Sequence, residues 1–299
     1  MKQFIYLALW FFKTKILKRK IPLQTVIFIS DLCNLTCKHC CVYSKGAPVI
    51  KSFEQIKDEL LYSYRLGSRF VDFEGGEPFL WNKEGKNIND LILLAKQIGF
   101  FSTTVTTNAQ IPFNNCQADS IWVSVDGIGK YHDQIRGEGS FSKLVQNITQ
   151  NNHPAMSINM VVNALNYTSV EDTIRWVSEQ PNLQSVAINF HTPYPGTEEL
   201  FLDWELRKKT IDKVLQMKKK GFQIMNSFSG LKKMKNNSFK QYCWVSNFIL
   251  ADGMRFSECP GKIQGVCTQC GFGMAGEIAS MFQLKPDTIL AAGKLRLHN

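Results

Sequence analysis

The chain has 299 residues, which is enough for a single barrel of about 200 to 250 residues and an appendage. Hydrophobic residues make up 44% of it and charged residues 20%, ordinary proportions for a globular protein. The nine cysteines are too sparse for a disulfide scaffold, and all but Cys116 fall into two groups, which indicates metal ligation in a reducing cytoplasm.

The formal net charge is +10, and two segments carry much of the excess. Residues 1–30 contain six basic residues and no acidic one, and residues 207–240 contain eleven basic residues against the single Asp212. The second run falls largely on a predicted helix, where lysines facing solvent are the simpler explanation. The sequence has no recognition-helix, zinc-finger or RNA-binding signature, so a nucleic-acid partner is not expected.

The N-terminal segment 1–22 contains nine consecutive apolar residues, Phe4 to Phe12, far short of the ~20 needed to span a bilayer. It lacks the small-residue cleavage site of a signal peptide. Two interpretations remain. The helix packs on the open side of the barrel, or it lies at a membrane surface with Trp10 at the boundary and its basic end against anionic headgroups. Packing is favoured, because short apolar runs usually belong to a core.

After this segment, predicted strands alternate with predicted helices. Helical crossovers between successive strands make a parallel sheet, so the fold class is α/β. Strands are expected at Thr25–Ser30, Arg69–Phe73 and near residues 100–106, 120–125, 157–163 and 185–190. Helices are expected at Ser52–Leu66, at Ile88–Ile98 before Gly99, and near residues 140–151 and 168–179.

The first cysteine group, Cys33, Cys37 and Cys40, has the spacing CxxxCxxC. Ferredoxins give each iron of a four-iron cluster its own cysteine, whereas three thiolates leave the fourth iron open for a small-molecule ligand. The alternative is a structural zinc site, which normally needs a closed tetrahedron, and the adjacent Cys41 could supply a fourth ligand. A strand leads into the cysteines and a second strand ends at Gly75-Gly76-Glu77-Pro78, an order that favours the cluster.

These motifs resemble those of the radical S-adenosylmethionine (SAM) superfamily, in which Cys33–Cys40 matches the cluster signature and Glu74–Pro78 the second motif. The resemblance implies an open, partial (β/α)6 TIM-like barrel, here over residues 23–225. It also implies that the open iron chelates SAM, and that an electron splits SAM to a 5′-deoxyadenosyl radical that takes hydrogen from the substrate. Weaker similarities follow in order: Thr107-Asn108-Ala109 with Ala in place of Gly, Ser124-Val125-Asp126-Gly127, His132-Asp133-Gln134-Ile135-Arg136-Gly137 and Met160-Val161-Val162-Asn163.

The resemblance places a SAM site at the carboxyl ends of the strands, where parallel βα folds bind their ligands. Glu77 is expected to accept the SAM amino group, and Arg136 to bind the carboxylate through two donors, unless it forms a surface salt bridge. Ser124 is expected to contact the ribose or carboxylate. His39 replaces the aromatic residue that usually packs on the adenine. The expected cofactor-binding residues are His39, Gly75, Gly76, Glu77, Pro78, Asn108, Ser124, Asp126, Arg136 and Asn163. Asparagines placed as Asn108 and Asn163 are more often turn or strand-end caps.

The second cysteine group comprises Cys243, Cys259, Cys267 and Cys270 in a loop-rich segment. Four thiolates with a terminal CxxC suit either zinc or a fully ligated four-iron cluster. The resemblance favours a second, auxiliary [4Fe–4S] cluster in a C-terminal cap, residues 226–299, of the short twitch type, since the seven-cysteine SPASM pattern is not met. Cys41 and Cys116 are expected to be buried free cysteines.

The sequence therefore predicts a cytoplasmic radical SAM enzyme that modifies a peptide, a protein or a cofactor precursor. Its partners are expected to be SAM and an electron donor such as flavodoxin or ferredoxin. One alternative is a radical SAM enzyme that acts on a lipid, with the N-terminal helix peripheral at the inner membrane surface. The other is a non-catalytic binding protein that holds zinc or a cluster. The loop His191–Gly196 after the sixth strand is either a substrate gate or a plain turn.

Overall fold

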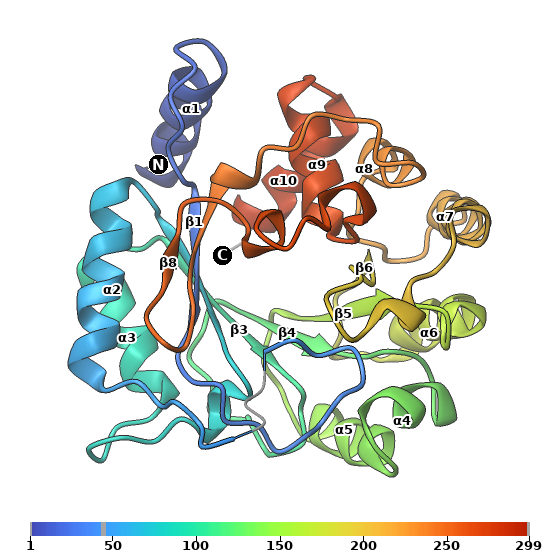
Figure 1. Cartoon of the computed structure of the whole chain (residues 1–299), viewed down its shortest axis with the longest axis horizontal. Coiled ribbons are helices and arrows are strands. Elements are labelled where there is room, and N and C mark those ends of the chain that lie inside the picture. Colours follow the sequence, from blue (N-terminus) through green and yellow to red (C-terminus); the bar gives the residue numbers. More distant parts are fainter. Residues whose placement is uncertain (1, 43–45, 298–299) are drawn as a thin grey trace.

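The computed structural model describes residues 2–42 and 46–297, which form an eight-stranded, open sheet with helices around it (Figure 1). The strands are β1 Gln24–Phe28, β2 Phe70–Glu74, β3 Ser102–Thr107, β4 Ser120–Ser124, β5 Met156–Val162, β6 Val186–Phe190, β7 Ser246–Ile249 and β8 Arg255–Phe256. Their order in the sheet is β6-β5-β4-β3-β2-β1-β7-β8, and only the β7–β8 pair is antiparallel among these strands. The predicted α/β fold with six parallel strands is confirmed.

The helices outside the sheet begin and end close to where the sequence predicts. Ser52 caps α2 by accepting the backbone N–H of Gln55, and α3 ends at Gly99, whose φ of +111° is a left-handed conformation that glycine adopts freely. The helices are α1 Lys2–Lys15, α2 Phe53–Leu66, α3 Ile88–Ile98, α4 Lys130–Arg136, α5 Ser140–Thr149, α6 Val170–Glu179, α7 Trp204–Lys219, α8 Phe228–Lys233, α9 Gly273–Phe282 and α10 Pro286–Leu297.

The C-terminal segment is less loop-rich than expected, because it adds β7, β8 and three helices to the fold. Strand β7 pairs in parallel with β1, from Gln24 opposite Ser246 to Ile27 opposite Ile249. The Asn247 side chain fixes this register by donating to Thr25 Oγ1 at 2.9 Å. Loops remain over residues 257–272, which contain three of its cysteines. The boundary at residue 225 stays a prediction, and residues 1, 298 and 299 of the outer segments lie outside the described residues.

The cysteine-bearing loops connect the two edges of the open sheet. The segment leaves β8 and returns to the end of β6, where the Phe190 N–H donates to Gly271 O at 2.8 Å (Figure 1). The Gly271 N–H in turn donates to Thr192 Oγ1 at 2.9 Å. A Cβ on Gly271 would lie 1.7 Å from Phe190 O, so this contact admits glycine alone. The sheet is thus left open as a barrel but bridged by backbone contacts.

Helix α1 packs at the amino-terminal ends of the strands through one face only. Trp10 is 4% exposed, lies in a cluster with Leu23, Phe70 and Phe282, and donates from Nε1 to Ile21 O at 2.8 Å. The other face leaves four large apolar side chains half or more exposed, Phe4, Ile5, Leu9 and Phe12, and Ile16 in the turn that follows is exposed as well. None of the described helices combines the length and the hydropathy that crossing a membrane requires.

We predict that Gly271→Ala lowers the melting temperature, because the added Cβ cannot avoid the Phe190 carbonyl oxygen and must push the segment off β6. Gly46→Ala is the matched control, since no atom of the described residues lies within 4 Å of its added Cβ. Thermal unfolding followed by circular dichroism measures both. Equal melting temperatures for the two variants would show that the bridge adds nothing to stability.

Candidate active site

The loop that carries the first cysteine group lies directly on the Gly-Gly-Glu-Pro motif. The Gly76 N–H donates to Ser30 O at 2.9 Å, and the Glu77 N–H donates to Leu32 O at 2.8 Å. A Cβ on Gly75 would lie 2.4 Å from Ser30 O, and one on Gly76 would lie 2.1 Å from Leu32 O. The two glycines are therefore required by this backbone contact, which holds the start of the cysteine loop against the end of β2.

Glu77 is fully buried and joins the ends of β2 and β3. Its carboxylate accepts hydrogen bonds from the Asn108 N–H at 2.8 Å, the Thr107 hydroxyl at 2.9 Å and the Phe79 N–H at 3.1 Å. Burial raises the pKa of Glu77 to about 7, and these donors oppose the rise. A carboxylate has about four acceptor positions, so one is left for a ligand. Pro78 follows at the first position of a short 3-10 helix, Pro78–Leu80.

Asn108 connects the end of β3 to the cysteine loop. Its Nδ2 donates to Asn34 Oδ1 at 2.8 Å and lies 3.7 Å from Cys33 Sγ. Its own Oδ1 accepts the Gln110 N–H, as expected of a turn cap. The next residue, Ala109, has a φ of +56°, a left-handed conformation that costs a residue with a Cβ roughly 1–2 kcal/mol. This strain accounts for the glycine that the related motif has at this position.

Asp126 and Arg136 form a buried ion pair beside the second cysteine. Arg136 Nε lies 2.6 Å from Asp126 Oδ2, and Arg136 Nη1 lies 3.9 Å from Cys37 Sγ. Burial would raise the pKa of Asp126, but the Arg136 guanidinium holds that pKa below its usual value. The other carboxylate oxygen accepts the Val161 N–H at 3.0 Å. Arg136 thus forms a salt bridge inside the site, and not at the surface.

Two histidines flank this pair as neutral imidazoles. Burial lowers the pKa of His39 to about 4 and that of His132 to about 3. His39 Nε2 lies 3.7 Å from Asp126 Oδ2, while its buried Nδ1 has no partner within residues 2–42 and 46–297. His132 Nδ1 accepts the Asp126 N–H at 3.1 Å. The ring of His39 also meets that of His191 edge to face, with 6.5 Å between centroids, so the loop after β6 reaches the site.

The remaining predicted residues lie at the ends of β4 and β5. Ser124 is the last residue of β4 and is partly exposed. Asn163 is buried and caps its turn by accepting the Leu165 N–H at 2.9 Å, but its Nδ2 has no partner. Sequence reasoning missed Asn166, whose Nδ2 donates to the Asp126 and Val161 carbonyls and joins the two loops. Its spacing from Asn163 at a strand end was the available signal.

All nine cysteines are free thiols. Within residues 2–42 and 46–297, no three or more Cys, His, Asp or Glu side chains converge on one metal ion. Each thiolate of a four-iron cluster binds a different iron, so convergence on a single point is not required of its ligands. Burial raises the pKa of Cys37 to about 11, and the thiols of Cys40 and Cys33 add to the rise. The donor set thus fits a cluster whose binding releases thiol protons.

The second cysteine group lies close to the first. Burial raises the pKa of Cys243 to about 12, and the thiols of Cys259, Cys270 and Cys267 add to this rise. Burial of its sulfur raises the pKa of Cys41 to about 11, and the thiols of Cys40, from the first group, and Cys259, from the second, add to the rise. The prediction that Cys41 is buried is wrong, because this residue lies at the surface of its loop and is exposed. Cys116 is buried, as predicted.

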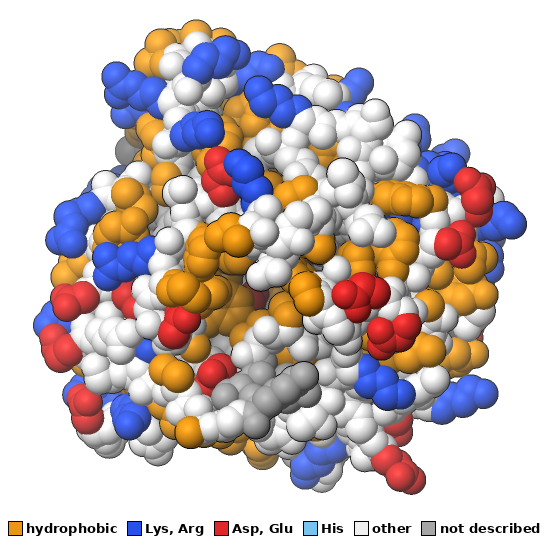
Figure 2. All heavy atoms as spheres, in the orientation of Figure 1, with side chains coloured by type: hydrophobic (Ala, Val, Ile, Leu, Met, Phe, Trp, Pro, Cys, Tyr) orange, Lys and Arg blue, Asp and Glu red, His pale blue; other side chains and the backbone are white. Residues whose placement is uncertain are grey.

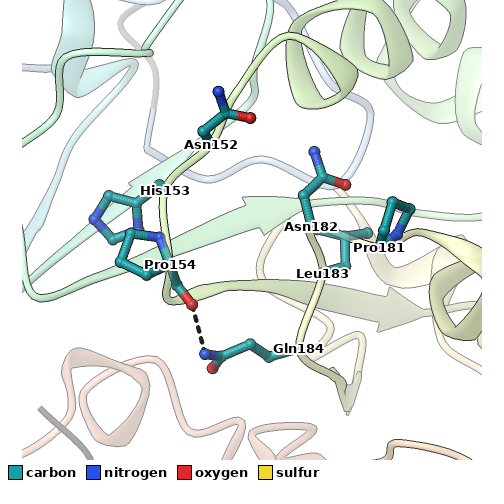
Figure 3. A pocket seen from close by; sticks show the side chains of 7 residues that line it. All are labelled: Asn152, His153, Pro154, Pro181, Asn182, Leu183 and Gln184. Carbon is teal, nitrogen blue, oxygen red and sulfur yellow. Dashed lines mark hydrogen bonds between the residues drawn. The ribbon is translucent and has the colours of Figure 1, made fainter.

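The surface of the molecule is hollowed in the middle of the face that Figure 2 shows, and hydrophobic side chains surround the hollow. A separate depression lies at the amino-terminal ends of β5 and β6, lined by Asn152, His153, Pro154 and residues 181–184 (Figure 3). It carries no charged side chain and lies at the opposite ends of these strands from the cysteines, so we do not assign it a role in the chemistry.

Residues 27–177 match the model of the Radical SAM superfamily. A GTP 3′,8-cyclase of Alkaliphilus oremlandii is 27% identical over 172 residues, which cover 52% of this chain and 52% of that protein. The chain thus aligns with about half the length of its curated relative.

Among solved structures, Streptococcus suis SuiB bound to its precursor peptide SuiA has a TM-score of 0.64 at 16% identity, and the match covers 87% of this chain and 65% of that one. The enzyme anSMEcpe with bound AdoMet has a TM-score of 0.62 at 17% identity, over 80% and 74% of the two chains. These likenesses show the fold. The family match spans just over half of the chain and includes Cys33–Cys40 and Gly75–Pro78, so the chain belongs to the radical SAM superfamily of enzymes, which use SAM and an iron–sulfur cluster.

Proposed function

We propose that Cys33, Cys37 and Cys40 hold a [4Fe–4S] cluster, that SAM binds at the iron they leave open, and that the resulting 5′-deoxyadenosyl radical takes hydrogen from a peptide or protein. The observation that carries this proposal is the contact of the cysteine loop with the other strand ends. Asn108, directly after β3, reaches Cys33, and Arg136, on α4 after β4, reaches Cys37. Motifs from four strands therefore share one site.

The polar atoms left without partners support the SAM site. We propose that the ammonium group of SAM meets the remaining acceptor position of Glu77, beside the backbone of Gly75 and Gly76. The unpartnered Nδ2 of Asn163 and Nδ1 of His39 are further hydrogen-bonding atoms for the same ligand. Buried polar atoms usually have partners, so such exceptions mark places where a ligand completes the structure. Pro78, Ser124, Asn108, Asp126 and Arg136 complete the proposed set, with Arg136 as the residue proposed to bind the SAM carboxylate.

We propose a second [4Fe–4S] cluster at Cys243, Cys259, Cys267 and Cys270, within a cap over residues 226–299. Burial raises the pKa of Cys243 to about 12, and the thiols of Cys259, Cys270 and Cys267 add to the rise, which supports treating the four as one group. Four thiolates leave no iron open, so this centre would transfer electrons or shape the site. The electron donor would be a flavodoxin or ferredoxin, and the free thiols suit a reducing cytoplasm.

A peptide is the substrate class that the site favours over a nucleotide. SuiB was solved with a precursor peptide and anSMEcpe with the Kp18Cys peptide, whereas the curated relative is named for GTP. Apolar side chains surround the hollow in Figure 2, and exposed Val49 and Met254 follow the carboxyl ends of β1 and β7. A triphosphate calls for unpaired cations, yet Arg136 is already paired with Asp126.

We predict that anaerobically prepared protein holds about eight irons, as two four-iron clusters. Changing Cys33, Cys37 and Cys40 together to Ala should remove half of the iron and abolish the formation of 5′-deoxyadenosine from SAM under reducing conditions. Cys116→Ala, a buried cysteine in neither group, is the matched control and should retain both. Iron analysis and chromatography of the products measure the effect. Continued SAM cleavage by the triple variant would refute the cluster assignment.

A second prediction separates SAM binding from folding. Glu77→Ala should weaken SAM binding about tenfold or more, which corresponds to about 1.4 kcal/mol, while iron content is retained. Arg136→Ala alone would leave Asp126 as a buried, unpaired charge, so the guanidinium is tested by comparing Asp126→Asn/Arg136→Ala with Asp126→Asn alone. The double variant should bind SAM more weakly than the single one. Arg175→Ala, an exposed arginine on α6, is the control. Calorimetric titration with SAM measures the affinity, and loss of the cluster would instead indicate a folding role.

The exposed face of α1 supports a second candidate function, action on a lipid at a membrane surface. Its apolar stripe, Phe4 to Ile16, is followed by the basic residues Lys18, Arg19 and Lys20, which are exposed. We propose that this face contacts anionic lipid, with the apolar side chains at the acyl boundary and the basic residues at the headgroups. The buried face of the same helix would remain packed on the barrel.

If α1 binds membranes, the protein should sediment with vesicles containing phosphatidylglycerol and be released at 1 M salt, where the Debye length is ~3 Å. Leu9→Glu/Phe12→Glu should abolish binding without changing the melting temperature, because both side chains are exposed. Trp10→Glu, on the buried face, should lower the melting temperature instead. Equal sedimentation of wild type and the double variant would remove the argument for a lipid substrate.

A further inference from the structure

Arg207 lies in the basic run that the sequence assigns to a solvated helix face, yet its side chain is fully buried. It projects from the first turn of α7 between two aromatic rings, with Cζ 4.6 Å from the Phe190 centroid and 4.8 Å from the Trp204 centroid. Its Nη2 donates to Cys270 O at 3.0 Å and to Asn237 Oδ1 at 3.2 Å. The guanidinium therefore lies against the last cysteine of the second group.

The charge of Arg207 has no carboxylate to balance it among the described residues. No described residue gives its buried Nε and Nη1 a hydrogen-bond partner. A buried cation without an anion is strongly destabilising, and such groups are nearly always paired. The surroundings of Arg207 are therefore incomplete without a negative charge on the side of Cys270.

The second cysteine group can supply that negative charge. Asn237 donates from Nδ2 to Cys270 O at 2.8 Å, and Gln241 donates to Cys267 O at 2.8 Å, so both backbone carbonyls of the CxxC are held in place. Four thiolates around a [4Fe–4S] core of charge 2+ carry a formal charge of about −2. A zinc ion would carry the same charge but would need the four sulfurs to converge on one point, which the described side chains do not do. Protonated thiols carry none, so the negative charge arises when the metal centre is bound.

We infer that Arg207 is the buried countercharge of a tetrathiolate metal centre at Cys243, Cys259, Cys267 and Cys270. It acts through the charge it places beside Cys270 and is a positioning residue, not a metal ligand. This inference rests on the second centre proposed above. If that centre is an iron–sulfur cluster, the fixed positive charge favours its more negative, reduced form and raises its reduction potential.

If Arg207 is a countercharge, its removal should change the melting temperature in opposite directions in the metal-free and the metal-loaded protein. In the metal-free protein Arg207 is an uncompensated charge, so Arg207→Met, which fills similar space between two rings, should leave the melting temperature unchanged or raise it. In the loaded protein the same change removes the ion that balances the thiolates and should lower the melting temperature. An arginine that serves packing alone would lower both.

The experiment uses the full chain with Cys33, Cys37 and Cys40 changed to Ala, so that bound metal reports on the second group alone. Three variants are compared in this background: Arg207→Met, Arg207→Lys and the control Lys209→Gln, whose amine is two residues further along α7 and exposed. Each is measured by thermal unfolding with and without metal, by the rate of metal loss to a chelator, and by a redox titration followed by electron paramagnetic resonance.

Arg207→Met should lose metal at least tenfold faster and be reduced about tenfold less readily, a shift of about 59 mV to more negative potential for one electron. Arg207→Lys should lie close to the parent, and Lys209→Gln should match it. Zinc in place of iron leaves the unfolding and chelator tests valid. If the background protein binds metal but Arg207→Met changes neither the rate of metal loss nor the melting temperature, Arg207 is not a countercharge. The proposal of a second centre would not be affected by that result. A background protein that binds neither iron nor zinc would overturn both.

Discussion

The close backbone contact between Ser30–Leu32 and Gly75–Gly76 is the constraint on which the site depends. It leaves no room for a Cβ at either glycine, and it sets the cysteine loop at the end of β2. Glu77, next in the chain, is then placed to accept from Thr107 and Asn108, and Asn108 reaches back to the loop beside Cys33. Three strand ends are thereby fixed by backbone atoms and one carboxylate, before any cofactor is bound.

A buried arginine lies against one cysteine of each cysteine group. Arg136 lies against Cys37 and Arg207 against Cys270, and both guanidinium groups are buried. Arg136 has Asp126 as a partner, so its site is balanced without metal. Arg207 has no such partner among the described residues, so its site is balanced only when the thiols are deprotonated. If the proposed second centre exists, we therefore expect it to depend on its metal more strongly than the first centre does.

The sequence predicts the regular part of the fold well, because strand and helix periodicities and caps such as Gly99 are local signals. It does not predict β7, which has four residues and is defined by pairing with β1 more than two hundred positions earlier. The spacing of the motifs indicated the candidate site residues, but it did not indicate which residues form hydrogen bonds and ion pairs with them. Arg207 reads as one of eleven basic residues in a run, and only tertiary packing shows that it is buried while Lys209 is exposed.

The central claim is that SAM binds the open iron of a cluster held by Cys33, Cys37 and Cys40. Electron paramagnetic resonance of reduced, anaerobic Cys243→Ala/Cys259→Ala/Cys267→Ala/Cys270→Ala protein, which keeps the first cysteine group alone, tests it most directly. The account predicts a four-iron signal that changes when SAM is added, because the amino and carboxylate groups enter the coordination shell of one iron. A signal that SAM leaves unchanged, or a protein that binds only zinc, would contradict it.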